Sequence, residues 1–324
     1  MSARVAGVAL SFVLLLAVIF LPLGLDPQGY AIRVFALIFL FAAMAQSWNI
    51  VGGLANQMSL GHAAFFGIGA YASTLLLIHI GLSPWLGMAV AALFGGAAAA
   101  LLSLPTMRLS GHYFALATLA FGEVMRVLAN TWAGVTGGPG GISVPFGQDS
   151  WWMLNFKSTR PHYYLTLGAL ITVTAVFIAI QRSAFGYRLR AVRENVSAAE
   201  VVGVDSIRTK ILAATISGGL IAALGTLYAQ LTFFFDPDTV FGIAPVSIRV
   251  ALIAILGGAG VAIGPIIGAL VIIPLEEGAN FAFASQAAGL SGLVYGLMLL
   301  TVILVEPRGL VALVGLRTRW RRGA

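Results

Sequence analysis

The chain has 324 residues, of which 60% are hydrophobic and only 9% are charged. A typical soluble domain has about 25% charged residues, and a soluble fold of this size leaves too much of its surface exposed to hide so many apolar side chains. The composition therefore excludes a soluble enzyme, a nucleic-acid-binding domain and a disordered protein. The net charge of +7 fits basic loops that orient membrane helices.

The longest stretch without a charged residue runs from Val34 to Met107, which is enough for about three bilayer spans of about 20 residues each. A lone segment in lipid must pair its own backbone groups, so each span is predicted to be a helix. We expect one all-α integral membrane domain over residues 1–324, a polytopic bundle of about 8–10 segments. The predicted spans are approximately 5–25, 34–51, 58–80, 85–104, 112–133, 163–181, 211–233, 246–274 and 289–305. The first is expected to remain as a span rather than to be a cleaved signal peptide.

Basic residues predict the orientation of the chain, because Lys and Arg concentrate in cytoplasmic loops. The loop 182–210 and the tail 307–324 are rich in arginine and are expected in the cytoplasm. The loop 134–162 then lies on the outer side, with Lys157 and Arg160 as exceptions.

Glycines predict a break in the stretch 246–274. The loop 182–210 and the tail are both expected in the cytoplasm, so an even number of membrane crossings must separate them. Three spans after residue 211 would give an odd number, whereas two short helices divided at Gly257 and Gly258 make the number even. One long tilted helix kinked at Pro265 is the alternative. A second glycine-rich interruption, 52–57, lies in the first half of the chain. Paired interruptions indicate a translocation path between two halves.

Polar residues in the run 57–72 support such a path, because polar groups in lipid are costly unless they are paired or face water. Its small residues at 63, 67 and 70 have the spacing of close helix packing, which is the alternative reading. The predicted pathway residues are Gln57, Ser59, Gly61, His62, Gly257, Gly258 and Gly264.

Several charges are predicted within or beside the spans. Glu123 and Arg126 are three residues apart on a predicted helix and can form an intramembrane ion pair, which either neutralises packed charges or serves gating. Arg249 and the pair Glu276 and Glu277 have no evident partners in the sequence and could instead anchor helices at the interface.

The loop 182–210 contains a predicted short surface helix that ends at Gly203, since glycine is a frequent helix stop. Its mixture of arginine, glutamate and small apolar residues suits a docking helix, although a solvated loop is the simpler reading.

Five stretches in order resemble the branched-chain amino-acid ABC-transporter permeases of the LivM type, within the LivH/LivM family. They are QMSLGHAAFFGIGAYA, GHYFALATLAFGEVMR, TGGPGGI, SAFGYRLRAVRENVSAAEVVGV and ILGGAG…GPIIGA. The resemblance implies a second homologous permease chain, two ABC ATPase subunits and a periplasmic binding protein, with lipid around them and no nucleic acid. It also implies ATPase docking by Arg190, Arg193, Glu194, Ala198, Ala199, Glu200 and Gly203, although the order of small residues departs from the usual docking pattern.

The residues themselves support a subunit without catalysis. A P-loop needs GxxxxGK[ST], and neither of the two lysines, Lys157 and Lys210, lies in one. ATP and Mg²⁺ would therefore bind to partner subunits, and no cofactor or metal is expected in this chain. The expected cargo is leucine, isoleucine or valine, with urea, short amides or other hydrophobic amino acids as alternatives. An ion-coupled secondary transporter would need Glu123 or Glu276 as its carboxylate, and a membrane enzyme lacks a visible catalytic cluster.

Overall fold

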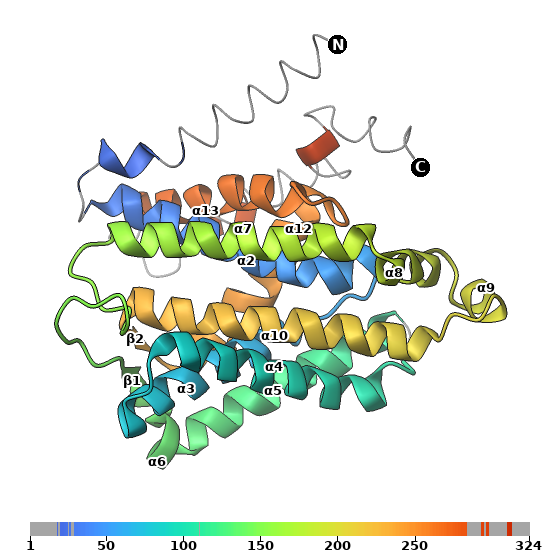
Figure 1. Ribbon diagram of the computed structural model, residues 1–324, viewed down its shortest axis with the longest axis horizontal. Coiled ribbons are helices and arrows are strands. Elements are labelled where there is room, and N and C mark those ends of the chain that lie inside the picture. Colours follow the sequence, from blue (N-terminus) through green and yellow to red (C-terminus); the bar gives the residue numbers. More distant parts are fainter. Residues whose placement is uncertain are drawn as a thin grey trace, which may run out of the picture.

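The computed structural model describes residues 18, 20–24, 26, 29–109, 111–283, 293–294, 296–297 and 310–312. Long helices run side by side along one axis of the molecule (Figure 1). The predicted spans 5–25 and 289–305 and the tail 307–324 lie mostly or wholly outside the described residues.

Nearly all of the described chain is helical. The α-helices are α2 (Tyr30–Asn49), α3 (His62–Ile80), α4 (Pro84–Thr106), α5 (His112–Thr131), α6 (Ala133–Thr136), α7 (Arg160–Arg182), α8 (Ala184–Glu194), α9 (Val196–Val201), α10 (Ser206–Thr232), α11 (Pro237–Phe241), α12 (Arg249–Gly258) and α13 (Gly264–Phe283). The other elements are the 3₁₀ turns η1 (Leu21–Leu23), η3 (Gly138–Gly140) and η5 (Leu310–Ala312), the π-helical turns η2 (Ile50–Leu54) and η4 (Ile243–Ile248), and the strands β1 (Ile142–Ser143) and β2 (Phe234–Phe235).

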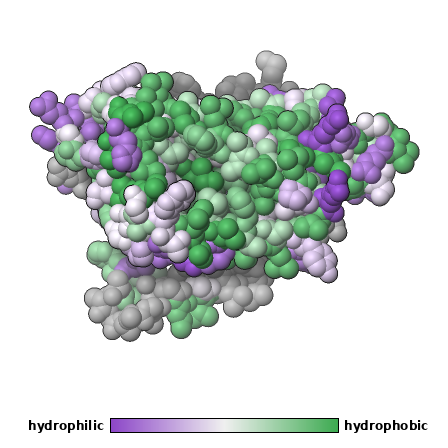
Figure 2. Space-filling model, turned by 90° about the horizontal axis from the view of Figure 1, so that it is seen from below, coloured by the Kyte–Doolittle hydropathy of each residue, from purple (hydrophilic) through white to green (hydrophobic). Residues whose placement is uncertain are grey.

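Six of the described helices are long and apolar enough to cross a membrane: α2 with η2, α3, α4, α7, α10 and α13. The stretch Ile243–Gly258 forms a shorter apolar helix, and α5, which was predicted as a span, is not among the six. Hydrophobic atoms cover the middle of the face in Figure 2, and hydrophilic atoms gather at its two ends. The polytopic helical membrane fold predicted from the sequence is confirmed.

Helix α2 is the central helix of the bundle, with 83% of its most apolar window buried. Around it, small residues bring helix backbones close together. A Cβ on Gly95 of α4 would lie 2.2 Å from the Ala222 Cβ of α10, and one on Gly218 of α10 would lie 2.5 Å from the Ala99 Cβ of α4. In lipid, such small-residue contacts provide much of the attraction between helices.

The two ends of the molecule carry different structures. Helices α8 and α9 project at one end, and β1, β2 and α6 lie at the other (Figure 1). Strand β1 pairs antiparallel with β2, Ile142 opposite Phe235 and Ser143 opposite Phe234. This pairing joins the predicted outer loop 134–162 to the segment that follows α10.

Two sequence expectations need correction. The span predicted from residue 58 begins at His62, because the segment 55–61 is not helical. The predicted single docking helix is two helices, α8 and α9. Asn195 lies between them in an extended conformation, and its side chain accepts a hydrogen bond from the Ala198 N–H and so caps the start of α9.

Candidate translocation pathway and docking surface

The first helix break lies between α2 and α3. Helix α2 continues through the π-helical turn η2, after which residues 55–61 leave backbone groups without intrahelical partners. Side chains supply some of the missing partners. The Trp48 Nε1–H donates to the Ser59 carbonyl at 2.8 Å, and the Leu60 N–H donates to the Thr118 hydroxyl at 3.0 Å. Non-helical backbone is tolerated at membrane depth only where protein or water satisfies it in this way.

His62 forms a buried hydrogen-bond network at the start of α3. Its Nε2 lies 2.8 Å from the Ser217 hydroxyl, which donates to the Ser47 carbonyl at 2.7 Å. Since the Ser217 proton is used there, the network assigns the proton to His62 Nε2. The Ser59 hydroxyl, 3.0 Å from Nδ1, is then a donor to His62. A neutral His62 therefore ties together α2, α3 and α10.

The predicted pathway residues of the first break are buried rather than exposed to an open channel. Ser59 and His62 are 4% and 2% exposed, and the small void beside them has a volume of about 10 Å³, room for at most one water molecule. Gly61 packs against the Thr118 carbonyl. Gln57 differs, because its side-chain oxygen is buried without a hydrogen-bond partner among the described residues.

The second break divides the stretch 246–274, as expected from its glycines. Helices α12 and α13 run antiparallel in direct backbone contact: a Cβ on Gly257 would lie 1.8 Å from the Gly264 carbonyl oxygen. Gly258 and Gly260 have φ angles of +129° and +81°, a region that L-residues with a side chain rarely adopt. Only glycine fits these positions.

The two breaks contact each other. The Asn49 carboxamide of α2 accepts a hydrogen bond from the Gly260 N–H at 2.7 Å and donates to the Val261 carbonyl at 3.2 Å. A Cβ on Gly53 would lie 2.4 Å from the Gly260 nitrogen. The structure thus joins the two halves at Asn49, Gly53 and Gly260, three residues that were not among the predicted pathway residues.

Glu123 and Arg126 form the expected ion pair, with Arg126 Nη2 2.5 Å from Glu123 Oε1. Asp238 of α11 joins it at 2.5 Å from Arg126 Nη1 and also accepts from Asn130 at 3.1 Å. The Arg126 and Glu123 side chains are 32% and 42% exposed, so this cluster lies at the protein surface. The hydrogen bonds from Arg126 and then Asn130 lower the pKa of Asp238 below its usual value.

A second ion pair joins α12 to α13. Arg249 Nη2 lies 2.5 Å from Glu276 Oε1, and both side chains are largely buried. The Arg249 guanidinium also stacks on the Phe41 ring, 4.9 Å from its centroid, and the Tyr30 hydroxyl donates to Glu277 at 2.6 Å. The residues that lacked evident partners in the sequence are therefore paired across helices.

The predicted docking residues differ in what they contact. The Arg190 guanidinium lies over the Tyr187 ring, and the Ser206 hydroxyl donates to Glu200. Ala199 is buried, whereas Glu194, Ala198 and Gly203 are exposed. Val201 and Val202, 87% and 77% exposed, form an apolar tip beside them. Arg193 is exposed too, but its Nη1 donates to the carbonyl of the buried Gly53 at 2.8 Å.

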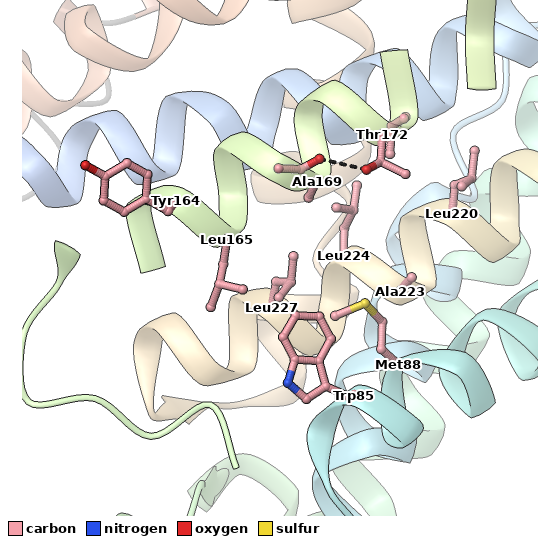
Figure 3. A pocket seen from close by; sticks show the side chains of 12 residues that line it. Trp85, Met88, Tyr164, Leu165, Ala169, Thr172, Leu220, Ala223, Leu224 and Leu227 are labelled. Atoms are coloured by element: carbon pink, nitrogen blue, oxygen red, sulfur yellow. Dashed lines mark hydrogen bonds between the residues drawn. The ribbon is translucent and has the colours of Figure 1, made fainter. Parts of the chain in front are cut away.

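A cavity of about 370 Å³ lies between α4, α7 and α10. Leucine, alanine and methionine side chains line it, together with Trp85 from α4 and Tyr164 from α7 (Figure 3). Its one hydroxyl from threonine, that of Thr172, donates to the Gly168 carbonyl at 2.8 Å. The cavity suits hydrocarbon rather than the charged ends of an amino acid. Among the described residues, no three His, Asp or Glu side chains gather as a metal site.

The bundle of long apolar helices with two glycine-containing breaks is that of a multi-pass membrane protein. Residues 30–303 match the family described as the branched-chain amino acid transport system/permease component, and the chain belongs to this family. It is 30% identical over 310 residues to the high-affinity branched-chain amino acid transport system permease protein LivM of Escherichia coli K12, covering 89% of this chain and 71% of the relative.

More distant relatives include both permease types. The probable branched-chain amino acid transport permease protein LivM of Methanocaldococcus jannaschii is 26% identical, covering 81% of each chain. The LivH permease protein of Escherichia coli K12 is 24% identical, covering 84% of this chain and 91% of the relative. No solved structure matches the chain.

Proposed function

We propose that this chain is a permease subunit of an ATP-driven ABC importer of the bacterial inner membrane, and that it translocates leucine, isoleucine or valine delivered by a periplasmic binding protein. Family membership supports the cargo class. The absence of a P-loop around either lysine of the sequence supports ATP hydrolysis by separate ATPase subunits. A second permease chain would complete the membrane part, as the similarity to both LivM and LivH suggests.

The observation that carries the transport role is the contact between the two helix breaks. The second break places the C-terminal end of α12 beside the start of α13, with Gly257 against Gly264, and the first break leaves one helix C-terminus at Leu54 and one helix N-terminus at His62. Helix C-termini carry partial negative charge and N-termini partial positive charge. A zwitterion needs both signs, and broken helices supply partial charges of both signs, with Arg193 already bound to the Gly53 carbonyl at the first break. The unpartnered amide oxygen of Gln57 adds an acceptor for an ammonium group.

The two ends of the molecule suit the two remaining partners. We assign the α8–α9 end to the cytoplasm, where the apolar tip of Val201 and Val202 and the neighbouring Arg190 and Glu194 would enter an ATPase groove. The opposite end, where β1 and β2 pair, would receive the binding protein.

Ion-coupled transport is the rival function, and it requires a carboxylate that can take up and release a proton or cation. Its two candidates, Glu123 and Glu276, are both ion-paired with arginine. Protonating Glu276 would leave the largely buried Arg249 uncompensated, and protonating Glu123 would leave Arg126 with Asp238 as its one remaining carboxylate partner among the described residues. The pairs therefore favour the ABC mechanism.

The test is affinity purification of this chain from its native membrane, followed by identification of the co-purified proteins. We expect a second permease and two P-loop ATPases, and then ATP-dependent leucine uptake in proteoliposomes when a matched binding protein is added. Uptake of urea or a short amide in place of leucine would change the cargo only. Purification of the chain alone, with uptake on an ion gradient, would overturn the ABC assignment.

A further inference from the structure

Arg193 is an exposed arginine of the loop 182–210 whose guanidinium nonetheless bonds a buried backbone carbonyl of the bundle, that of Gly53. It lies in the last turn of α8, two residues before Asn195, which caps the start of α9. Its Nη1 donates to the Gly53 carbonyl at 2.8 Å. A Cβ on Gly260 would lie 3.0 Å from the same nitrogen, so the guanidinium also lies against the second break.

Both segments beside Arg193 are helix C-terminal ends. Gly53 belongs to η2, which ends at Leu54, and Gly260 follows the end of α12 at Gly258. The last carbonyls of a helix have no intrahelical partners and carry partial negative charge. Arginine remains charged at any physiological pH and has several fixed donors, so it can cap such carbonyls while it keeps its position.

Neutral side chains supply the other hydrogen bonds where the two helix breaks meet. The Asn49 carboxamide bridges Gly260 and Val261, and the Gln181 amide of α7 donates to the Gly260 carbonyl at 3.2 Å. These groups connect α2, α7 and the α12–α13 break to one another. Arg193 adds a side-chain link from α8 to this group of contacts, beside the direct connection of α7 to α8 through Ser183.

We infer that Arg193 is a positioning residue that transmits displacement of α8 and α9 to both helix breaks. The inference rests on the proposed function, since it needs ATPases that move α8 and α9. A guanidinium held by Gly53 cannot stay in place when α8 shifts relative to α2. The shift therefore either moves the first break, and with it the second break packed against it, or releases the Gly53 carbonyl, and either event changes the path between the two halves.

The test compares Arg193→Ala with Arg188→Ala in the purified complex. Arg188 lies exposed on the same helix, so both variants remove one positive charge from α8. We expect both to retain the ATPases and to hydrolyse ATP. Arg193→Ala should transport at least about tenfold less leucine per ATP hydrolysed, while Arg188→Ala should couple normally. Arg193→Lys, which retains one charged donor for Gly53, should restore part of the coupling.

A second readout separates transmission from simple support of the fold. The chain has no cysteine, so Val261→Cys provides a single labelling site in the second break. We expect its reaction with a water-soluble thiol reagent to depend on added ATP, and Arg193→Ala to abolish that dependence while hydrolysis continues. If Arg193→Ala does not insert, Arg193→Lys and Arg193→Gln should both show a reduced dependence.

Three outcomes would overturn the inference. Normal coupling in Arg193→Ala would show that the contact transmits nothing. Loss of the ATPases from Arg193→Ala alone would make Arg193 a docking residue. A wild-type complex without ATPases would refute the proposed function first, and this result is visible before any variant is made.

Discussion

The two helix breaks solve one problem in different ways. Both leave backbone groups without helical partners inside an apolar bundle, where each unsatisfied group is costly. The first break, 55–61, uses side chains from its surroundings: Trp48, Thr118 and the His62 network. The second break, 259–263, uses glycines that let two backbones meet, and it takes its hydrogen bonds from the Asn49 carboxamide of α2.

This difference predicts different sensitivities. A break held by side chains loses stability when a polar group is removed, and a break held by backbone contact loses it when an atom is added. The second break also depends on α2, so the two should open together when Asn49 is altered.

The largest effect is expected from adding atoms to the second break. Gly257→Leu forces a side chain against the Gly264 carbonyl, and overpacking of this kind costs about 1–3 kcal/mol or more. Because two backbones must separate here, we expect almost no monodisperse protein in size-exclusion chromatography. Gly278→Leu on α13, where a Cβ meets nothing within 4 Å, is the control. Equal yield and melting temperature of both variants would contradict the packing argument.

The next effect comes from removing a polar group at the first break. His62→Ala leaves the Ser59 and Ser217 hydroxyls without their partner and opens a cavity, at a cost of about 3 kcal/mol. We expect a clear fall in the melting temperature of the purified protein. His79→Ala, which changes an exposed histidine of the same helix, should leave it almost unchanged. A similar small change for His62→Ala would mean that the network stabilises little.

A smaller effect should link the two breaks. Asn49→Ala removes two hydrogen bonds to the second break, worth about 1–3 kcal/mol if the partners stay unsatisfied. Hydrogen exchange should become faster in residues 257–264 and remain unchanged in α10. Gln46→Leu is the matched control, because the buried Gln46 amide on the same helix has no partner to lose. Unchanged hydrogen exchange of residues 257–264 in Asn49→Ala would show that Asn49 does not couple the two breaks.

The smallest effect is expected away from both breaks, at Asp238. Its lowered pKa means that the contact with Arg126 contributes stability above the usual pKa of aspartate and that this contribution is lost as pH falls through the lowered value. Exposed pairs are worth less than about 1 kcal/mol. The melting-temperature difference between wild type and Asp238→Asn should therefore be small at pH 7 and vanish in strong acid. A melting-temperature difference between the two proteins that grew as the pH fell would contradict this predicted direction.

Charged and glycine residues show how far the sequence alone can be read. Glu123 and Arg126 were predictable as a pair because three residues on a helix bring them to one face. Asp238 and the pair of Arg249 with Glu276 were not, because helices remote in sequence supply the partners. The glycine breaks were visible as interruptions in apolar runs, whereas Asn49 looked like an ordinary polar residue at the end of a span.

Composition and the spacing of apolar runs determined that this chain is a multi-pass helical membrane protein, because lipid allows so few backbone solutions. Local chemistry also determined where helices break, since glycine has the freedom that such turns require. The tertiary structure alone decided that the two breaks meet at Asn49 and Gly53 and that Arg193 bonds the Gly53 carbonyl beside this contact. These contacts depend on how separate helices pack, and helical periodicity within one segment carries no information about its neighbour in space.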